Sequence, residues 1–190
     1  GEAFDKVAKI IGLPYPGGPS IAAAAENGDP LAYKLPISKL KGPYDFSFSG
    51  LKTAALRAVQ REVDVDTTFP SFKLSELLND VQQANFAASF QYTAVKTLVD
   101  TTWRAFNDYS PASVVIAGGV AANSELRKQL QDRLPIPIEY APMQLCTDNG
   151  AMIATLGCFY AERMEPSSPL DLEVQPSLSM TKTAWHAAKL

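Results

Sequence analysis

The segment from Val114 to Leu130 carries the pattern that most strongly indicates a binding site. A short apolar run, Ser113 to Ala117, is typical of a strand buried on both faces, and Gly118-Gly119 follows it directly. Paired glycines let a ligand approach the backbone because no Cβ intervenes. The next helix then offers unpaired N–H groups, and Asn123 at its start is placed to hydrogen-bond a ribose or a base edge. An ordinary turn with Asn123 as an N-cap explains the same residues, so both interpretations stay open.

A second turn that exposes backbone lies at Pro16-Gly17-Gly18-Pro19. By itself it is also explained as a stiff connection with Pro19 in the first turn of a helix. Two Gly-Gly turns that each open a helix together favour a nucleotide cleft. The full Gly-x-Gly-x-x-Gly pattern is absent, which argues against a dinucleotide site of the Rossmann type.

Two acidic residues, Asp148 and Asp5, are candidate ligand contacts, and they lie far apart in the sequence. Asp148 stands at the start of an apolar helix, where it is either an N-cap or one ligand of a metal whose other ligands come from elsewhere. Asp5 lies on the polar face of the first predicted helix and by itself is a solvated residue. The only histidine is His186, so a His-Glu-x-x-His metalloprotease site is excluded.

Basic side chains gather on one predicted helix, after the segment Asp45 to Ser49. Lys52, Arg57 and Arg61 either touch phosphate or form a solvated helical face. The whole chain has 17 Lys and Arg against 20 Asp and Glu, a net charge of −3. That balance excludes a broadly basic nucleic-acid surface, although not a local basic patch.

The elements that must position these residues follow from hydrophobic periodicity and turn residues. Helices are predicted at about 2–11, 20–27, 51–61, 75–107 (either one helix or two that meet near 84–85), 124–130 and 148–163. Strands are predicted near Leu35 and at 45–49, 113–117 and 136–140. The strand–helix order after Pro111 predicts parallel α/β pairing.

With 46% hydrophobic and 19% charged residues, the 190-residue chain has the composition of a globular protein. No apolar run approaches the ~18 residues of a membrane span.

Five blocks of this sequence together resemble the tRNA threonylcarbamoyladenosine transferase family, formerly called O-sialoglycoprotein endopeptidases or glycoproteases. They follow the family's order across most of the chain, and the Phe-Ser-Phe-Ser-Gly-Leu-Lys-Thr form is similar to the bacterial and organellar branch. The blocks are Gly1-Glu-Ala-Phe-Asp-Lys-Val-Ala-Lys, Tyr15-Pro-Gly-Gly-Pro, Asp45-Phe-Ser-Phe-Ser-Gly-Leu-Lys-Thr, Ile116-Ala-Gly-Gly-Val-Ala-Ala-Asn-Ser-Glu-Leu-Arg and Cys146-Thr-Asp-Asn-Gly-Ala-Met-Ile-Ala.

The resemblance implies an α/β fold, a ribonuclease-H-like lobe of the actin, sugar-kinase and chaperone ATPase fold with a largely helical insertion. Residues 1–190 are then a single C-terminal lobe, helical over about 1–110 and α/β over about 111–164, with an extended tail at 165–190. The N-terminal lobe, and with it a pair of metal-ligating histidines and the loop that holds the acyl phosphate, is expected outside this chain.

The implied reaction moves a threonylcarbamoyl group from threonylcarbamoyl-AMP to N6 of the adenosine beside a tRNA anticodon. By motif position, Asp5 and Gly18 are expected to contact the nucleotide sugar, and Asn123 the nucleoside. Gly17, Gly118 and Gly119 would line the site with backbone, and Asp148 would be a metal ligand. No catalytic residue is assigned, and Ala22 stands where some relatives have an acidic nucleotide contact.

The resemblance also implies ligands and partners. The ligands are one divalent metal ion of the iron or zinc class, completed by histidines outside this chain, and threonylcarbamoyl-AMP or an ATP-like nucleotide. The partners are tRNA, the N-terminal lobe, a degenerate paralogue and a small ATPase subunit, with no membrane. The expected location is the cytoplasm, or an organellar matrix in a eukaryote, and the chain alone is expected to be inactive. The alternative is a non-catalytic nucleotide-binding or scaffold subunit of the same complex.

Overall fold

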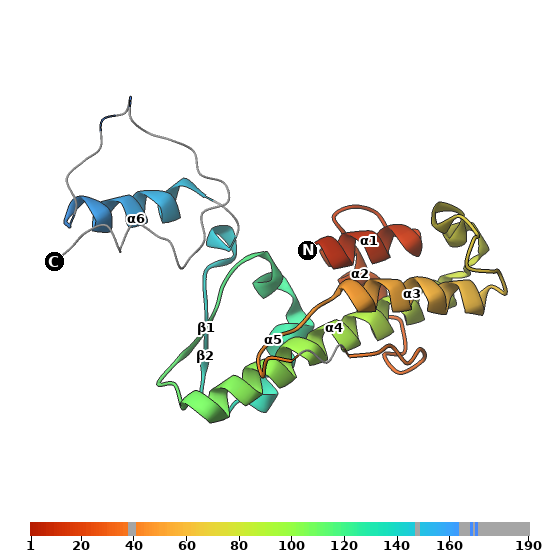
Figure 1. The fold of residues 1–190 in the computed structure, drawn as a ribbon, viewed down its shortest axis with the longest axis horizontal. Helices are drawn as coiled ribbons and strands as arrows, with labels where there is room; N and C mark the ends of the chain where they lie inside the picture. The colour runs from red at the N-terminus through yellow and green to blue at the C-terminus, as the bar shows by residue number, and fades with distance from the viewer. Residues whose placement is uncertain (38–40, 147–148, 164–167, 169, 171–190) are drawn as a thin grey trace. The chain divides into compact units, whose positions relative to one another are not determined.

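The computed structural model describes residues 1–37, 41–146, 149–163, 168 and 170 (Figure 1). The chain divides into two compact units, residues 1–147 and residues 148–190, and each is described by itself. The described residues are mostly helical and contain one two-stranded parallel sheet. The mixed α/β class is therefore confirmed. None of the helices in these ranges is both long and apolar enough to cross a membrane.

A first hydrophobic core lies where three helices meet the N-terminal half of a fourth. The three are α1 (Glu2–Ile10), α2 (Gly17–Ala25) and α3 (Ser49–Glu62). The apolar residues that predicted α1 do face this core, since Val7 is 1% exposed and Ile11 is 0% exposed. Gly12 follows with φ +81°, a conformation that suits glycine and ends the helix as predicted.

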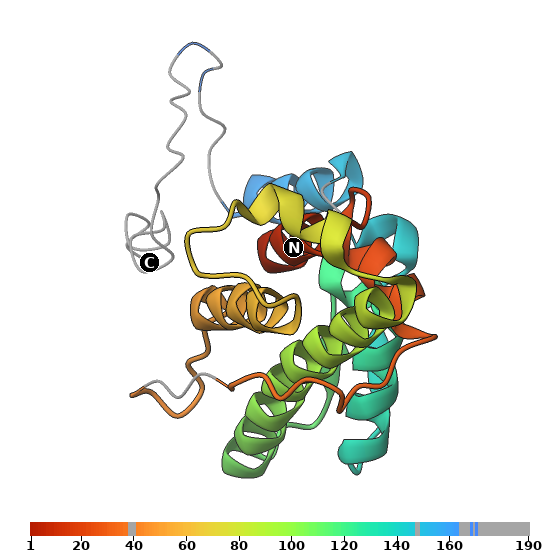
Figure 2. The same ribbon diagram turned by 90° about the vertical axis from the view of Figure 1, so that its right-hand side faces the viewer.

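The fourth helix, α4 (Asp80–Tyr109), has 30 residues and by its rise is about 45 Å long. Its N-terminal half supplies Phe86 and Phe90 to the first core, and its C-terminal half supplies Val95 and Val99 to a second core. Figure 1 shows α3 alongside the first half, and Figure 2 shows α5 alongside the second. Of the two predicted alternatives, the single continuous helix is confirmed, because no Pro or Gly interrupts it.

The start of α4 also differs from the prediction. Ser75 belongs to the short 3₁₀ helix η1 (Ser71–Leu77), and Asn79 is the N-cap. Asn79 accepts from the Gln82 N–H at 2.9 Å, while the Gln82 side chain accepts from the Asn79 N–H at 3.1 Å. This reciprocal capping box satisfies two backbone donors, which Ser75 could not do from outside the helix.

The second core is built around the predicted strand–helix–strand unit. Strand β1 (Val114–Ile116) pairs in parallel with β2 (Ile138–Tyr140), with Val114 opposite Ile138. A 3₁₀ turn, η2 (Gly119–Ala122), and helix α5 (Ser124–Arg133) connect the two strands. The parallel pairing is confirmed. The prediction that β1 is buried on both faces is wrong, because Val115 is 60% exposed and only the opposite face packs against the second core.

Two predicted strands do not form. Residues 45–48 are irregular and lead directly into α3, and Leu35 lies in an irregular segment. In the part of the chain that the structure describes, no strand runs beside either segment, so their backbone has no sheet to join. Phe48 packs against the first core as a loop residue, whereas Phe46 is 45% exposed.

The described part of the second unit is mainly α6 (Gly150–Ala161), where a helix is predicted. Asn149 caps it by accepting from the Met152 N–H at 3.0 Å. A short 3₁₀ turn, η3 (Met143–Leu145), is the last helical element of the first unit.

Candidate functional site

Asp5 is not simply a solvated residue of α1. Its side chain is half-buried, and Oδ1 accepts a hydrogen bond from the Gly17 N–H at 2.8 Å. Gly17 is the first residue of α2, where Pro16 provides no side-chain cap. The carboxylate of one helix therefore caps the next, and its charge lies favourably at the positive end of α2. A cap from twelve residues upstream leaves no local signal in the sequence.

The two glycines of the first Gly-Gly turn have different roles. The prediction that α2 begins near Ser20 is wrong, since both glycines lie in its first turn. A Cβ on Gly17 would lie 2.5 Å from the Asp5 Cα and from the Phe4 carbonyl oxygen. A Cβ on Gly18 would have nothing within 4 Å. Gly17 is thus needed for contact between α1 and α2, whereas Gly18 presents an open, half-exposed surface.

Asn123 is the N-cap of α5, as the sequence predicted. Its Oδ1 accepts from the Leu126 N–H at 2.9 Å, and its Nδ2 donates to Gln91 Oε1 at 2.9 Å. The side chain is half-buried. One N–H of the amide is left to donate to a ligand. Its predicted contact with a nucleoside stays a prediction.

The second Gly-Gly turn is exposed. Gly118 has φ +87°, and a Cβ on Gly118 or Gly119 would meet nothing within 4 Å. The Gly118 conformation disfavours other residues, and its carbonyl accepts from the Ala121 N–H at 3.0 Å to form η2. This turn has room for a ligand against the backbone just before Asn123.

Two consecutive residues of α4 link these regions. Phe90 is fully buried and packs edge-on against Phe4, the neighbour of Asp5, with ring centroids 5.0 Å apart. Gln91 is the next residue and holds Asn123. Neither residue was singled out by sequence reasoning, although a glutamine within the largely apolar stretch 86–95 is a signal, because a buried amide needs a partner.

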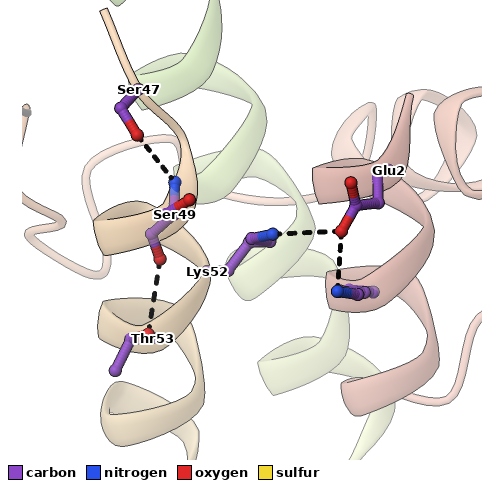
Figure 3. Close-up of polar contacts among 6 residues, drawn as sticks. Glu2, Ser47, Ser49, Lys52 and Thr53 are labelled. Atoms are coloured by element: carbon purple, nitrogen blue, oxygen red, sulfur yellow. Dashed lines mark hydrogen bonds and ion pairs between the residues drawn. The ribbon is translucent and has the colours of Figure 1, made fainter. Parts of the chain in front are cut away.

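The predicted basic surface is largely engaged within the protein. Lys52 pairs with Glu2 at 3.3 Å, and Lys6 pairs with the same carboxylate at 2.7 Å (Figure 3). Hydrogen bonds from both lysines lower the pKa of Glu2. Arg57 donates to Gln60 and to the Thr67 carbonyl. Lys52 therefore links α3 to α1, and whether Lys52, Arg57 and Arg61 touch phosphate stays a prediction.

The predicted metal ligand, Asp148, lies outside the described residues. Within ranges 1–37, 41–146 and 149–163, with residues 168 and 170, no group of three His, Cys, Asp or Glu side chains could hold a metal ion. The described residues therefore do not fit a metal by themselves.

The chain is similar in sequence to proteins of one family. The sequence pattern of the family described as tRNA N6-adenosine threonylcarbamoyltransferase matches residues 1–155. A protein of that name from Thermomicrobium roseum is 43% identical over 197 residues, covering 100% of this chain and 54% of that protein. The chain belongs to this family.

Other members of the tRNA N6-adenosine threonylcarbamoyltransferase family give the same picture. Proteins of that name from Symbiobacterium thermophilum and Gloeobacter violaceus are 47% and 45% identical. Each alignment covers 95% of this chain, but only 50% and 49% of the relative. The chain spans about half the length of the curated relatives it matches.

The different roles of the two glycines in α2 can be tested by matched substitutions. We expect Gly17→Ala to lower the free energy of unfolding by about 1–3 kcal/mol or more, because the methyl group would overlap the backbone of α1. Gly18→Ala should change it by less than about 1 kcal/mol. Urea unfolding followed by circular dichroism measures both, and equal losses would contradict the assigned roles.

Proposed function

We propose that this chain supplies the nucleotide-binding part of a tRNA N6-adenosine threonylcarbamoyltransferase. The whole protein would transfer a threonylcarbamoyl group from threonylcarbamoyl-AMP to N6 of the adenosine adjacent to a tRNA anticodon. The observation that carries the proposal is the family match over residues 1–155, a range that contains every residue predicted to contact the nucleotide. The open surfaces at Gly18 and Gly118-Gly119 support it.

The nucleotide would be bound mainly by groups at the starts of two helices, α2 and α5. Asp5 Oδ1 is occupied by the Gly17 N–H, which leaves Oδ2 to accept from a ribose hydroxyl. Gly18 lets the sugar approach the first turn of α2. The remaining amide N–H of Asn123 would donate to an acceptor on the nucleoside. These groups are held by the fold before the ligand arrives, which lowers the entropic cost of binding.

The transfer itself needs little covalent chemistry from this chain. The N6 nitrogen attacks the carbamoyl carbon, a new N–C bond forms, and the bond from that carbon to the phosphate oxygen breaks. N6 loses one proton to solvent, and AMP leaves with the electron pair of the broken bond. The mixed anhydride is already activated, so positioning of both substrates provides much of the acceleration.

The finer fold is part of the proposal. We infer a ribonuclease-H-like lobe of the actin, sugar-kinase and chaperone ATPase fold. The parallel β1–α5–β2 unit supports it, and the helices of residues 2–109 would be the helical insertion.

Other parts of the function would come from outside this chain. With a net charge of −3, the chain has no general attraction for tRNA, so most of the tRNA contact is assigned to the N-terminal lobe and to partner subunits. These partners are the degenerate paralogue and the small ATPase, in the cytoplasm or an organellar matrix.

Asp148 would contribute one ligand to a divalent ion of the iron or zinc class. Histidines elsewhere would complete the set of ligands, and such an ion would polarise substrate oxygens.

The nucleotide site can be tested with Gly18→Leu and a matched control, Gly50→Leu. Both glycines are the second residue of a helix, and a Cβ on either meets nothing within 4 Å. In the full-length protein, we expect Gly18→Leu to lower kcat/KM at least roughly tenfold, equivalent to about 1.4 kcal/mol, because leucine fills the space of the sugar. Formation of threonylcarbamoyladenosine is measured by mass spectrometry of digested tRNA.

Gly50→Leu should keep the activity, and both variants should keep the wild-type melting temperature. Activity retained in Gly18→Leu would contradict the placement of the nucleotide. A wild-type protein that forms no threonylcarbamoyladenosine with its partners present would contradict the proposed function.

The metal assignment is tested by Asp148→Ala in the full-length protein, with Asp132→Ala as the control. Asp132 is an exposed acidic residue of α5. We expect Asp148→Ala to lose most of the bound metal after dialysis, because each ligand of a small set contributes strongly to affinity. Asp132→Ala should retain it, as measured by elemental mass spectrometry. Equal metal content in the two variants would refute the assignment.

A further inference from the structure

Gln91 is a buried polar side chain of α4 near the point where the two hydrophobic cores adjoin. Phe90 and Ala94 belong to the first core and Val95 to the second, and Gln91 is only 8% exposed. Burial of an amide is unfavourable unless it is hydrogen-bonded. Its Oε1 accepts from Asn123 Nδ2 at 2.9 Å. The buried glutamine is therefore directed at one of the residues predicted to touch the nucleotide.

The hydrogen bond from Gln91 completes the orientation of the Asn123 amide. The Leu126 N–H binds Asn123 Oδ1 at 2.9 Å, so α5 holds the oxygen end and α4 holds the nitrogen end. With both ends held, the second N–H of Nδ2 has one direction available. The cap alone would hold only the oxygen end and would leave the nitrogen end without a partner from the protein.

Gln91 is itself held in position by its neighbour. Phe90 is 0% exposed and packs edge-on against Phe4 at 5.0 Å, and Phe4 precedes Asp5 on α1. The backbone at residue 91 is thereby tied to the helix that carries the other predicted nucleotide contact.

We propose that Gln91 is a positioning residue for the nucleotide contact of Asn123. It acts through Asn123 and directs the free amide N–H toward an acceptor atom of the nucleoside, a ring nitrogen or a ribose oxygen. The assignment rests on the proposed function, because it needs Asn123 to contact the nucleotide. It predicts that residue 91 affects nucleotide affinity as well as stability.

The experiment compares Gln91→Met with Gln83→Met in the full-length protein. Gln83 lies on the same helix, and its Nε2 donates to the Ile11 carbonyl at 2.7 Å, a contact between elements that does not involve Asn123. The dissociation constant of AMP, the KM for threonylcarbamoyl-AMP, kcat and the melting temperature are measured for each variant. A purely structural role at residue 91 would make the two variants alike.

We expect Gln91→Met to raise the dissociation constant and the KM roughly tenfold, as for loss of one oriented hydrogen bond, with a smaller change in kcat. Gln83→Met should leave both constants within about twofold. Gln91→Glu should bind more tightly than Gln91→Met, because its carboxyl group keeps an oxygen to accept from Asn123. In Asn123→Ala, adding Gln91→Met should have little further effect on binding, since coupled residues are not additive.

Unchanged AMP binding in Gln91→Met, or additive effects of the two substitutions, would overturn the assignment. If Gln91→Met alone is unstable, Gln91→Glu keeps the test valid, because its carboxyl oxygen still accepts from Asn123, and loss of AMP binding by a folded Gln91→Glu variant would count against the assignment. Normal binding by Asn123→Ala would instead show that Asn123 is not a nucleotide contact, which is a failure of the proposed site. Loss of binding in Asn123→Ala without loss in Gln91→Met would refute only the role of Gln91.

Discussion

The structure depends on one continuous helix that has to bury apolar residues in two separate cores. The 30 residues of α4 run from the first core to the second, and the capping box at Asn79 starts the helix without help from distant residues. A helix without an internal Pro or Gly transmits the position of one end to the other. Helix α5 packs directly against this helix, whereas α1 packs mainly on α2, α3 and η1 and reaches α4 through the ring contact between Phe4 and Phe90.

Local patterns predicted the elements whose determinants are local. The apolar spacing of α1, the positive-φ glycine after it, the Asn123 cap and the parallel pairing of β1 with β2 were all predictable, because each depends on neighbouring residues or on a short crossover. The start of α2 was not, since Asp5 caps it from another helix. The alternation at 45–49 resembles a strand, but a strand also needs a partner edge, and local sequence carries no information about one.

The candidate site divides in the same way. Gly17, Gly18, Gly118 and Gly119 are visible as turn residues, and family motifs single out Asp5 and Asn123. The division of labour between Gly17 and Gly18 follows from helix packing, and the role of Gln91 follows from burial and from a partner 32 residues away. Such roles depend on tertiary contacts, which residue type and spacing alone do not specify.

The central claim is that a single nucleotide contacts the start of α2 and the start of α5 together. Hydrogen exchange of the full-length protein tests this directly, with and without a non-reactive analogue of threonylcarbamoyl-AMP. The account predicts that peptides covering residues 17–20 and 118–126 gain protection over the same range of ligand concentration, because bound ligand lowers the rate of local opening. Protection of only one of these segments, or of neither, would contradict it.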